Sequence, residues 1–367
     1  MCSLGALMRI VALGLVLMSF AGQSYGHLQY GFYKGKCTVR HKDNIVEKIV
    51  AKEVRKAYRK DNSIVAALLR LQFHDCFVNG CDASILLDGN NTEKTAFPNQ
   101  SVRGYDLIDT IKKRLERVCP EIVSCADIIA IATRDAISLA TLLTRAGKPW
   151  KFNVQTGRRD GKVSNASNTV DLPPSTISVK DSIKLFQKKG LNATDMVFLL
   201  GGHTVGVTHC FFIQNRLYNF KNTTKPDPTM NPTLVRALRR RCPQRRSSGN
   251  NTINLDQNRF SSLTVDNSYY KQLLLNKGIL QFDQDLASDR RTKNAVKLIA
   301  KSTYEEFNIN FAQAIVKMQA VDVITDPKKG QIRRSCRAVT PYEWYALNMM
   351  SRDVEWLDMS STLSSQI

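Results

Sequence analysis

The segment Arg70-Leu-Gln-Phe-His74-Asp-Cys-Phe-Val-Asn-Gly-Cys-Asp-Ala-Ser84 sets an arginine and a histidine within a run of apolar residues. Apolar positions here recur at helical spacing, so we predict a helix. Because four residues separate them, the side chains of Arg70 and His74 lie about 40° apart around the helix axis and roughly 6 Å apart along it. Both side chains can therefore reach one pocket.

Such a pair suits the cleavage of an oxygen–oxygen bond. A neutral imidazole can take a proton from one oxygen and return it to the leaving oxygen, while a guanidinium stabilises the developing negative charge. The alternative is an amphipathic helix whose polar residues are merely solvated. The apolar stretch from Ile64 to Phe77 argues against that alternative, because a buried charge or imidazole needs a partner or a function.

Oxygen-bearing side chains surround the tight turn Val78-Asn-Gly80 that follows. Asp75, Asp82 and Ser84 supply hard oxygen donors, and the turn supplies backbone carbonyls. This density of oxygen ligands suits calcium. A simple turn pinned by the two neighbouring cysteines has equal weight on these residues alone.

A second histidine lies in Leu199-Leu-Gly-Gly-His203-Thr-Val-Gly206. Glycines around a histidine permit the close approach of a flat ligand such as haem. Haem iron is commonly held by one axial histidine whose other ring nitrogen donates to a carboxylate, for which Asp283 is a candidate. The alternative is a satisfied core histidine near a helix end. No C-x-x-C-H motif is present, so a haem here would be held without covalent attachment.

The 367-residue chain has 43% hydrophobic and 23% charged residues, as in an ordinary globular protein, and shows no linker or repeat. We therefore predict one large, mainly helical domain. Helical spacing of apolar residues is found at 45–54, 65–71, 108–118, 128–139, 212–217 and 298–311, with irregular stretches at 88–103, 157–176, 220–231 and 243–265.

The N-terminus predicts secretion. Arg9 precedes an apolar run that is too short to span a bilayer, and the small residues Ser24 and Gly26 follow at the minus-three and minus-one positions of a cleavage site, so we predict a signal peptide over residues 1–26 and no membrane span. Eight cysteines remain after its removal, which argues for four disulfides but leaves 105 pairings open. Sequons for N-glycosylation stand at Asn90, Asn99, Asn165, Asn192, Asn222 and Asn250.

A formal net charge of +21 predicts affinity for acidic surfaces. Nucleic acid is one candidate partner. However, the basic residues are spread along the chain and no nucleic-acid-binding motif is present, so we favour an acidic polysaccharide over nucleic acid.

At this point the sequence resembles the plant secretory, or class III, haem peroxidases. The resemblance runs from about Gln29 to Cys336, so we expect a peroxidase domain over residues 27–336. Its motifs occur in the family's order: Phe73-His-Asp-Cys-Phe-Val-Asn-Gly-Cys-Asp82, Val123-Ser-Cys-Ala-Asp127, Gly157-Arg-Arg-Asp160, Gly201-Gly-His-Thr204 and Asp266-Asn-Ser-Tyr-Tyr270.

The resemblance implies an all-α fold in which distal and proximal helical lobes enclose a haem b. It implies His203 as axial ligand, His74 as proton acceptor and Arg70 as stabiliser of the transition state. The remaining implied roles are Asn99 as acceptor from His74, Glu93 as a link from that loop to the distal calcium site, Phe73 as a shield over the reactive centre, and the Pro173 carbonyl as a contact for donors. An internal Asn99 would not be glycosylated.

The resemblance also implies metal ligands and disulfides. Distal calcium would be bound by Asp75, Val78, Gly80, Asp82 and Ser84, and a proximal calcium by Thr204, Asp256 and Asp266. The second site departs from the family pattern at Arg259, which replaces a threonine, so we expect weak or absent binding there. Leu255 replaces an aromatic that some relatives place against the axial histidine. The implied disulfides are Cys37–Cys119, Cys76–Cys81, Cys125–Cys336 and Cys210–Cys242.

The expected function is that of a monomeric, secreted peroxidase that reduces hydrogen peroxide and oxidises small phenolic donors, such as lignin precursors or auxin, by single electrons. A non-enzymatic wall protein and a calcium-binding or lectin-like module are the alternatives. Residues 337–367 extend beyond the usual end of the family. They are a vacuolar sorting signal, a flexible end or an artefact of the gene model.

Overall fold

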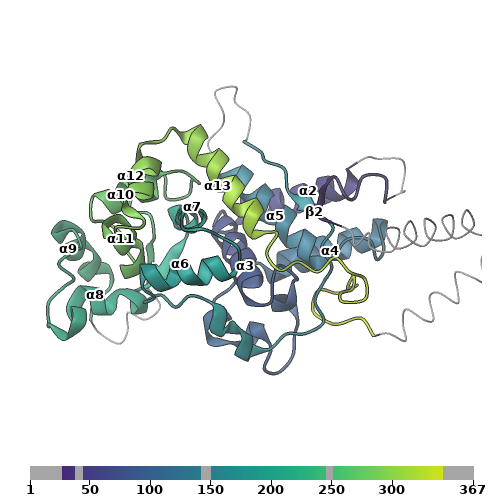
Figure 1. The fold of residues 1–367 in the computed structure, drawn as a ribbon, viewed down its shortest axis with the longest axis horizontal. Helices are drawn as coiled ribbons and strands as arrows, with labels where there is room; N and C mark the ends of the chain where they lie inside the picture. The colour runs from purple at the N-terminus through teal and green to yellow at the C-terminus, as the bar shows by residue number, and fades with distance from the viewer. Residues whose placement is uncertain (1–26, 38–43, 142–149, 245–250, 342–367) are drawn as a thin grey trace, which may run out of the picture.

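The computed structural model describes residues 27–37, 44–141, 150–244 and 251–341 (Figure 1). The expected signal peptide, the sequon at Asn250 and residues 342–367 of the C-terminal extension lie outside these ranges. Within them the fold is all-α, as predicted, with only two short pairs of strands.

The longer elements are the α-helices α2 (Ile45–Lys60), α3 (Ile64–Val78), α4 (Tyr105–Val118), α5 (Cys125–Ala140), α6 (Val179–Lys188), α7 (Ala193–Leu200), α8 (Gln214–Tyr218), α9 (Pro232–Arg241), α10 (Ser268–Leu274), α11 (Gln281–Ser288), α12 (Lys293–Lys301) and α13 (Tyr304–Met318). The 3-10 helices, most of them shorter, are η2 (Ser84–Leu86), η3 (Glu93–Thr95), η4 (Phe97–Asn99), η5 (Ala166–Asp171), η6 (Gly201–Thr204), η7 (Cys210–Ile213) and η8 (Phe220–Asn222). Strand β1 (Gln29–Tyr30) pairs antiparallel with β2 (Gln155–Thr156), and β3 (Val207–His209) with β4 (Thr252–Asn254).

Helix α5 is the centre of one half of the molecule. It is apolar around nearly its whole circumference and is buried along nearly its whole length, which is typical of a helix enclosed by others. Helices α2, α3 and α4 pack against it. Figure 1 shows this group on one side, α8 to α12 on the other, and α6, α7 and α13 between them.

The predicted helices occur with two differences. The apolar periodicity over 298–311 belongs to α12 and α13, because Thr303 begins a new helix through a reciprocal capping box with Glu306. The pattern over 212–217 spans the end of η7 and the start of α8. No helix in the described ranges has both the length and the apolar composition needed to cross a bilayer.

Four disulfides join Cys37 to Cys119, Cys76 to Cys81, Cys125 to Cys336 and Cys210 to Cys242, the same pairs that the resemblance implies. Cys125–Cys336 connects the start of α5 with the last described segment across 211 positions of sequence. Cys210–Cys242 holds a small separate core beneath α8 and α9. The first three bridges belong to the main core.

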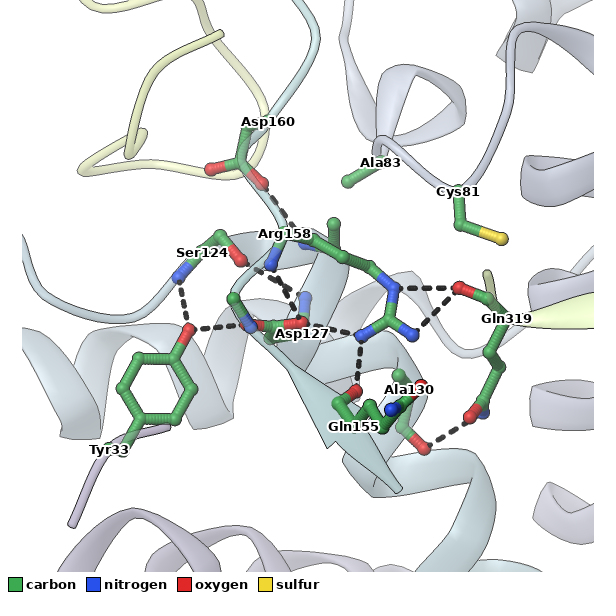
Figure 2. A network of polar contacts seen from close by, with 12 residues as sticks. Tyr33, Cys81, Ala83, Ser124, Asp127, Ala130, Gln155, Arg158, Asp160 and Gln319 are labelled. Carbon is green, nitrogen blue, oxygen red and sulfur yellow. Dashed lines mark hydrogen bonds and ion pairs between the residues drawn. The ribbon is translucent and has the colours of Figure 1, made fainter. Parts of the chain in front are cut away.

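A buried polar network connects α5 with the segments around it (Figure 2). The Arg158 guanidinium donates to Asp127 Oδ1 at 2.7 Å, and to the carbonyls of Gln155 and Gln319. Asp127 also accepts from the Tyr33 hydroxyl at 2.6 Å. Arg158 and Asp127 are almost fully buried, and each charge is matched by the other and by hydrogen bonds.

We expect Asp127→Asn to lower the free energy of unfolding by about 3–5 kcal/mol, because the substitution leaves the Arg158 charge buried and uncompensated. Asp61→Asn is the matched control, since the Asp61–Arg103 ion pair is exposed and its loss should cost less than about 1 kcal/mol. Denaturant unfolding of the disulfide-intact protein measures both values. Equal losses would contradict the importance of the buried pair.

Candidate functional site

Arg70 and His74 lie on α3 and contact each other. Arg70 Nε donates to His74 Nε2 at 3.2 Å, and His74 Nδ1 lies 2.6 Å from Asn99 Oδ1. Because Nε2 accepts a hydrogen bond, the proton of the neutral imidazole belongs on Nδ1, which donates to Asn99. The arrangement leaves Nε2 as the basic nitrogen.

Two loop groups hold the Arg70 guanidinium. It donates to the Ser101 hydroxyl at 3.0 Å and to the Pro98 carbonyl at 2.9 Å. Ser101 and Pro98 were not among the residues predicted from the sequence. The signal available was their position on either side of Asn99, in a loop that must return to α3 for Asn99 to reach His74.

Asn99 connects His74 to the loop behind it. Its side-chain nitrogen donates to the Glu93 carbonyl at 2.8 Å, so the orientation of the amide is fixed from both ends. Asn99 is only 1% exposed, as expected for an asparagine that does not carry a glycan. Asn165 and Asn192, in two other sequons, cap η5 and α7 with their side-chain oxygens.

The environment of His74 favours the uncharged ring. Burial and the Arg70 charge lower the pKa of His74 to about 3, although the hydrogen bond with Asn99 acts in the opposite direction. The imidazole is therefore neutral and able to accept a proton throughout the neutral and mildly acidic range.

Buried oxygen atoms gather next to this pair. Asp75 Oδ1, Ser84 Oγ and Glu93 Oε2 are buried and complete no hydrogen bond in the described part of the chain. Burial raises the pKa of Asp75, and the charge of Asp82 raises it further. Unsatisfied oxygens and mutually repelling carboxylates are what a bound cation would correct.

Calcium fits this donor set. The described ranges contain no group of three His, Cys, Asp or Glu side chains that could hold a metal by themselves. A cation here would therefore need the Ser84 hydroxyl and the Val78 and Gly80 carbonyls in addition to Asp75 and Asp82, and calcium accepts such ligands. The Glu93 carboxylate accepts from Asn79 at 2.7 Å and so ties the Asn99 loop to this turn.

His203 lies in η6, directly after α7. Its Nδ1 is 3.0 Å from Asp283 Oδ1 on α11, where Asp283 is only 1% exposed. Burial lowers the pKa of His203, but the charge and hydrogen bond of Asp283 outweigh this, so the pKa lies above its usual value. The other ring nitrogen, Nε2, has no hydrogen-bond partner among the described residues, and 32% of the side chain is exposed.

The surroundings of His203 differ from the expectation in detail. Gly201 packs against Tyr270 and Phe307, and Gly206, at a φ of +91°, packs against Ala66 of α3. These two glycines therefore serve contacts within the protein. Only Gly202 faces open space, so a flat ligand could approach there. With Leu255 in place of an aromatic, the ring beside His203 is Tyr269, edge-on at 6.0 Å.

The two constellations lie on neighbouring elements. Helix α3 packs against η6, and the Arg70 charge opposes, without overcoming, the effect of Asp283 that raises the pKa of His203. Both Arg70 and His203 keep accessible surface although they lie between packed helices. The guanidinium–imidazole pair on α3 and the imidazole nitrogen of η6 that has no partner among the described residues therefore belong to two elements in contact.

The expected residues of the second calcium site also come together. Thr204 Oγ1 donates to Asp266 Oδ1 at 3.1 Å, and the charge of Asp266 acts on Asp256, whose pKa burial raises to about 6. Arg259 is exposed, with its guanidinium over the Phe260 ring, and brings no oxygen to the cluster.

Phe73 and Pro173 border the distal side. The Phe73 ring stacks on Phe77 at 4.1 Å and packs near Phe186, so its position beside His74 is fixed. Pro173 is half-buried and follows η5, which packs against α3. Phe73 thus lies on α3 itself, and Pro173 follows a 3-10 helix that contacts α3.

Comparison with known proteins gives one consistent result. A family model described as Peroxidase matches residues 50–302. Peroxidase 60 of Arabidopsis thaliana is 50% identical over 329 residues, which cover 90% of this chain and 95% of that protein. Peroxidase 57 of the same plant is 46% identical over 88% of this chain and 96% of its own length, and Peroxidase 44 is 46% identical over 89% and 98%.

Proposed function

Because this chain belongs to the peroxidase family, we propose that it reduces hydrogen peroxide with a haem b held by His203 and oxidises small phenolic donors by one-electron steps. The observation that supports the proposal is the contact between α3, which carries the Arg70–His74 pair, and η6, which carries the free His203 Nε2. We propose that the haem occupies a cleft between these two elements. Peroxidase activity follows from the family; the cofactor, the residue roles and the class of donor are our proposals.

His203 and Asp283 would hold the haem. The free Nε2 of His203 would be the ligand atom, and the hydrogen bond from Nδ1 to the buried Asp283 would increase the basicity of that ligand. When bound, the haem supplies a redox-active iron at which peroxide is reduced and donors are oxidised. Gly202 leaves room beside His203 for the porphyrin plane.

The distal residues manage protons and charge. His74 Nε2 accepts a proton from one peroxide oxygen and returns it to the leaving oxygen, which departs as water. Asn99 keeps the other ring proton on Nδ1, so that Nε2 stays available. Arg70, fixed by Ser101 and Pro98, offers a permanent positive charge to the oxygen that becomes negative.

Phe73 and Pro173 support a phenolic donor that reacts at the border of the cleft. The stacked Phe73 ring fills space beside His74 and would keep donors from the distal interior. The half-buried Pro173 carbonyl would accept a hydrogen bond from a phenol hydroxyl.

Calcium is the second cofactor that we propose. Distal calcium would be bound by Asp75, Val78, Gly80, Asp82 and Ser84, and the unsatisfied Asp75 and Ser84 oxygens support this assignment. The cluster of Thr204, Asp256 and Asp266 would bind a proximal calcium more weakly, because Arg259 replaces a ligand of the family pattern.

We also propose that the enzyme is a secreted monomer whose macromolecular partner is acidic wall polysaccharide. Four disulfides are typical of an oxidising compartment, and the net charge of +21 favours polyanions. A vacuolar destination remains the alternative that residues 337–367 raise.

Replacing His74 with Ala should slow the reaction with peroxide by about 10²–10⁴, the usual contribution of a positioned acid–base group. Stopped-flow measurement of the holoenzyme with peroxide gives this rate. His209→Ala is the matched control, because His209 is exposed, lies in β3 and is not among the residues that we assign to the site. An unchanged rate in His74→Ala, with the haem bound, would remove the assignment.

Removing calcium should destabilise the protein. A ligand present at a hundred times its dissociation constant adds about 2.7 kcal/mol to the free energy of unfolding, so thermal unfolding should shift when a chelator replaces calcium. Ser84→Ala should reduce this shift, whereas Asp256→Asn should leave most of it. A melting temperature that is the same with and without calcium would contradict the proposed distal calcium site.

A further inference from the structure

Helix α2 carries a row of cations on its outer face. Lys48, Lys52, Arg55 and Arg59 are exposed and stand at positions i, i+4, i+7 and i+11. They therefore lie within about 60° of one another around the axis and extend about 16 Å along it. We call these four residues the basic stripe; Lys56 and Lys60 are exposed beside it.

The acidic residues of α2 do not neutralise the stripe. Glu53 is buried and pairs with Arg114 of α4 at 3.1 Å, and Glu47 pairs with Arg134 of α5. Asp61, just past the helix, pairs with Arg103. No member of the stripe has an ion-pair partner within residues 27–37, 44–141, 150–244 and 251–341.

Such an arrangement opposes helix formation in the free protein. Like charges three and four residues apart repel each other on a helix surface, and the stripe contains three such spacings in succession. A linear polyanion lying along the helix would relieve this repulsion. The neighbouring helix α4, which packs against α2, carries two further exposed cations, Lys113 and Arg117.

We propose that the basic stripe binds an acidic polysaccharide of the polyuronate class and anchors the enzyme to it. This inference rests on the proposed secretion and partner class, and it adds the surface that makes the contact. Sugar carboxylates repeated along an extended chain match cations repeated along a helix. Figure 1 places α2 with α4 and α5, away from α8 to α11.

Other polyanions fit the surface less well. Proteins that bind single-stranded nucleic acid add aromatic rings on which bases stack, but the aromatic of α2, Tyr58, packs against the core. Helices that bind membranes insert an apolar face, but Val46, Val50 and Val54 of α2 are buried within the protein. The stripe offers charge alone, which is sufficient for a polyuronate.

The test compares two variants that lose the same charge. One carries Lys48→Gln, Lys52→Gln, Arg55→Gln and Arg59→Gln. The other carries Lys180→Gln, Lys225→Gln, Arg236→Gln and Arg290→Gln, four exposed cations on four separate parts of the chain. The holoenzymes are titrated with polygalacturonate over a range of salt concentrations, with neutral dextran and single-stranded DNA as comparison polymers.

We expect the stripe variant to bind polygalacturonate at least about tenfold more weakly, with a shallower dependence on salt, and the control variant to bind like the unmodified enzyme. Equal losses in both variants would overturn the proposal, because net charge alone would then set the affinity. Stripe-dependent binding of DNA that is tighter than that of polygalacturonate would also overturn it.

Turnover of a small phenol in solution is measured in parallel. Both variants should keep the activity of the unmodified enzyme, which shows that they fold. Failure of the proposed chemistry would appear as absent turnover in all three proteins. Failure of the anchoring proposal would appear only in the binding curves.

Discussion

The hydrogen bond between His74 and Asn99 is the interaction on which the site depends. It fixes the tautomer of the imidazole, so that the nitrogen facing Arg70 is the basic one. Asn99 is held in turn by the Glu93 carbonyl, and the Glu93 carboxylate by Asn79 at the end of α3. The tautomer of His74 is therefore set by a chain of hydrogen bonds that runs from α3 through Asn99 and Glu93 and returns to the end of α3 at Asn79.

The same path makes the oxygen cluster around Asp75 a structural support for the chemistry. His74 and Asp75 are adjacent on α3, so any movement of the turn that follows the helix is transmitted to the imidazole from two directions. A cation that satisfies the buried oxygens would hold this turn in one position. The segment 79–99 after α3 contains several Gly and Asn residues, yet hydrogen bonds from Asn79, Glu93 and Asn99 hold it in place.

Much of this arrangement could be predicted from the sequence, because it depends on short spacings and recognisable motifs. Arg70 and His74 share a helix face, and His203 lies in a glycine-rich segment. The anchors of Arg70 could not be predicted, since Ser101 and the Pro98 carbonyl reach it only through the course of a loop. From the sequence, the glycines near His203 were expected to make room for a ligand. Two of them instead accommodate Tyr270 and Ala66, and these contacts depend on tertiary packing that the sequence does not display.

The C-terminal segment has a consequence for how the protein is made. Arg158 binds the Gln319 carbonyl, Asp160 accepts from the Arg333 backbone, and Cys125 is bonded to Cys336. The centre of the fold therefore lacks essential contacts until the chain has been synthesised as far as Cys336. Folding of the N-terminal helices during synthesis can yield only an incomplete core, whose completion and Cys125–Cys336 disulfide must wait for this C-terminal segment.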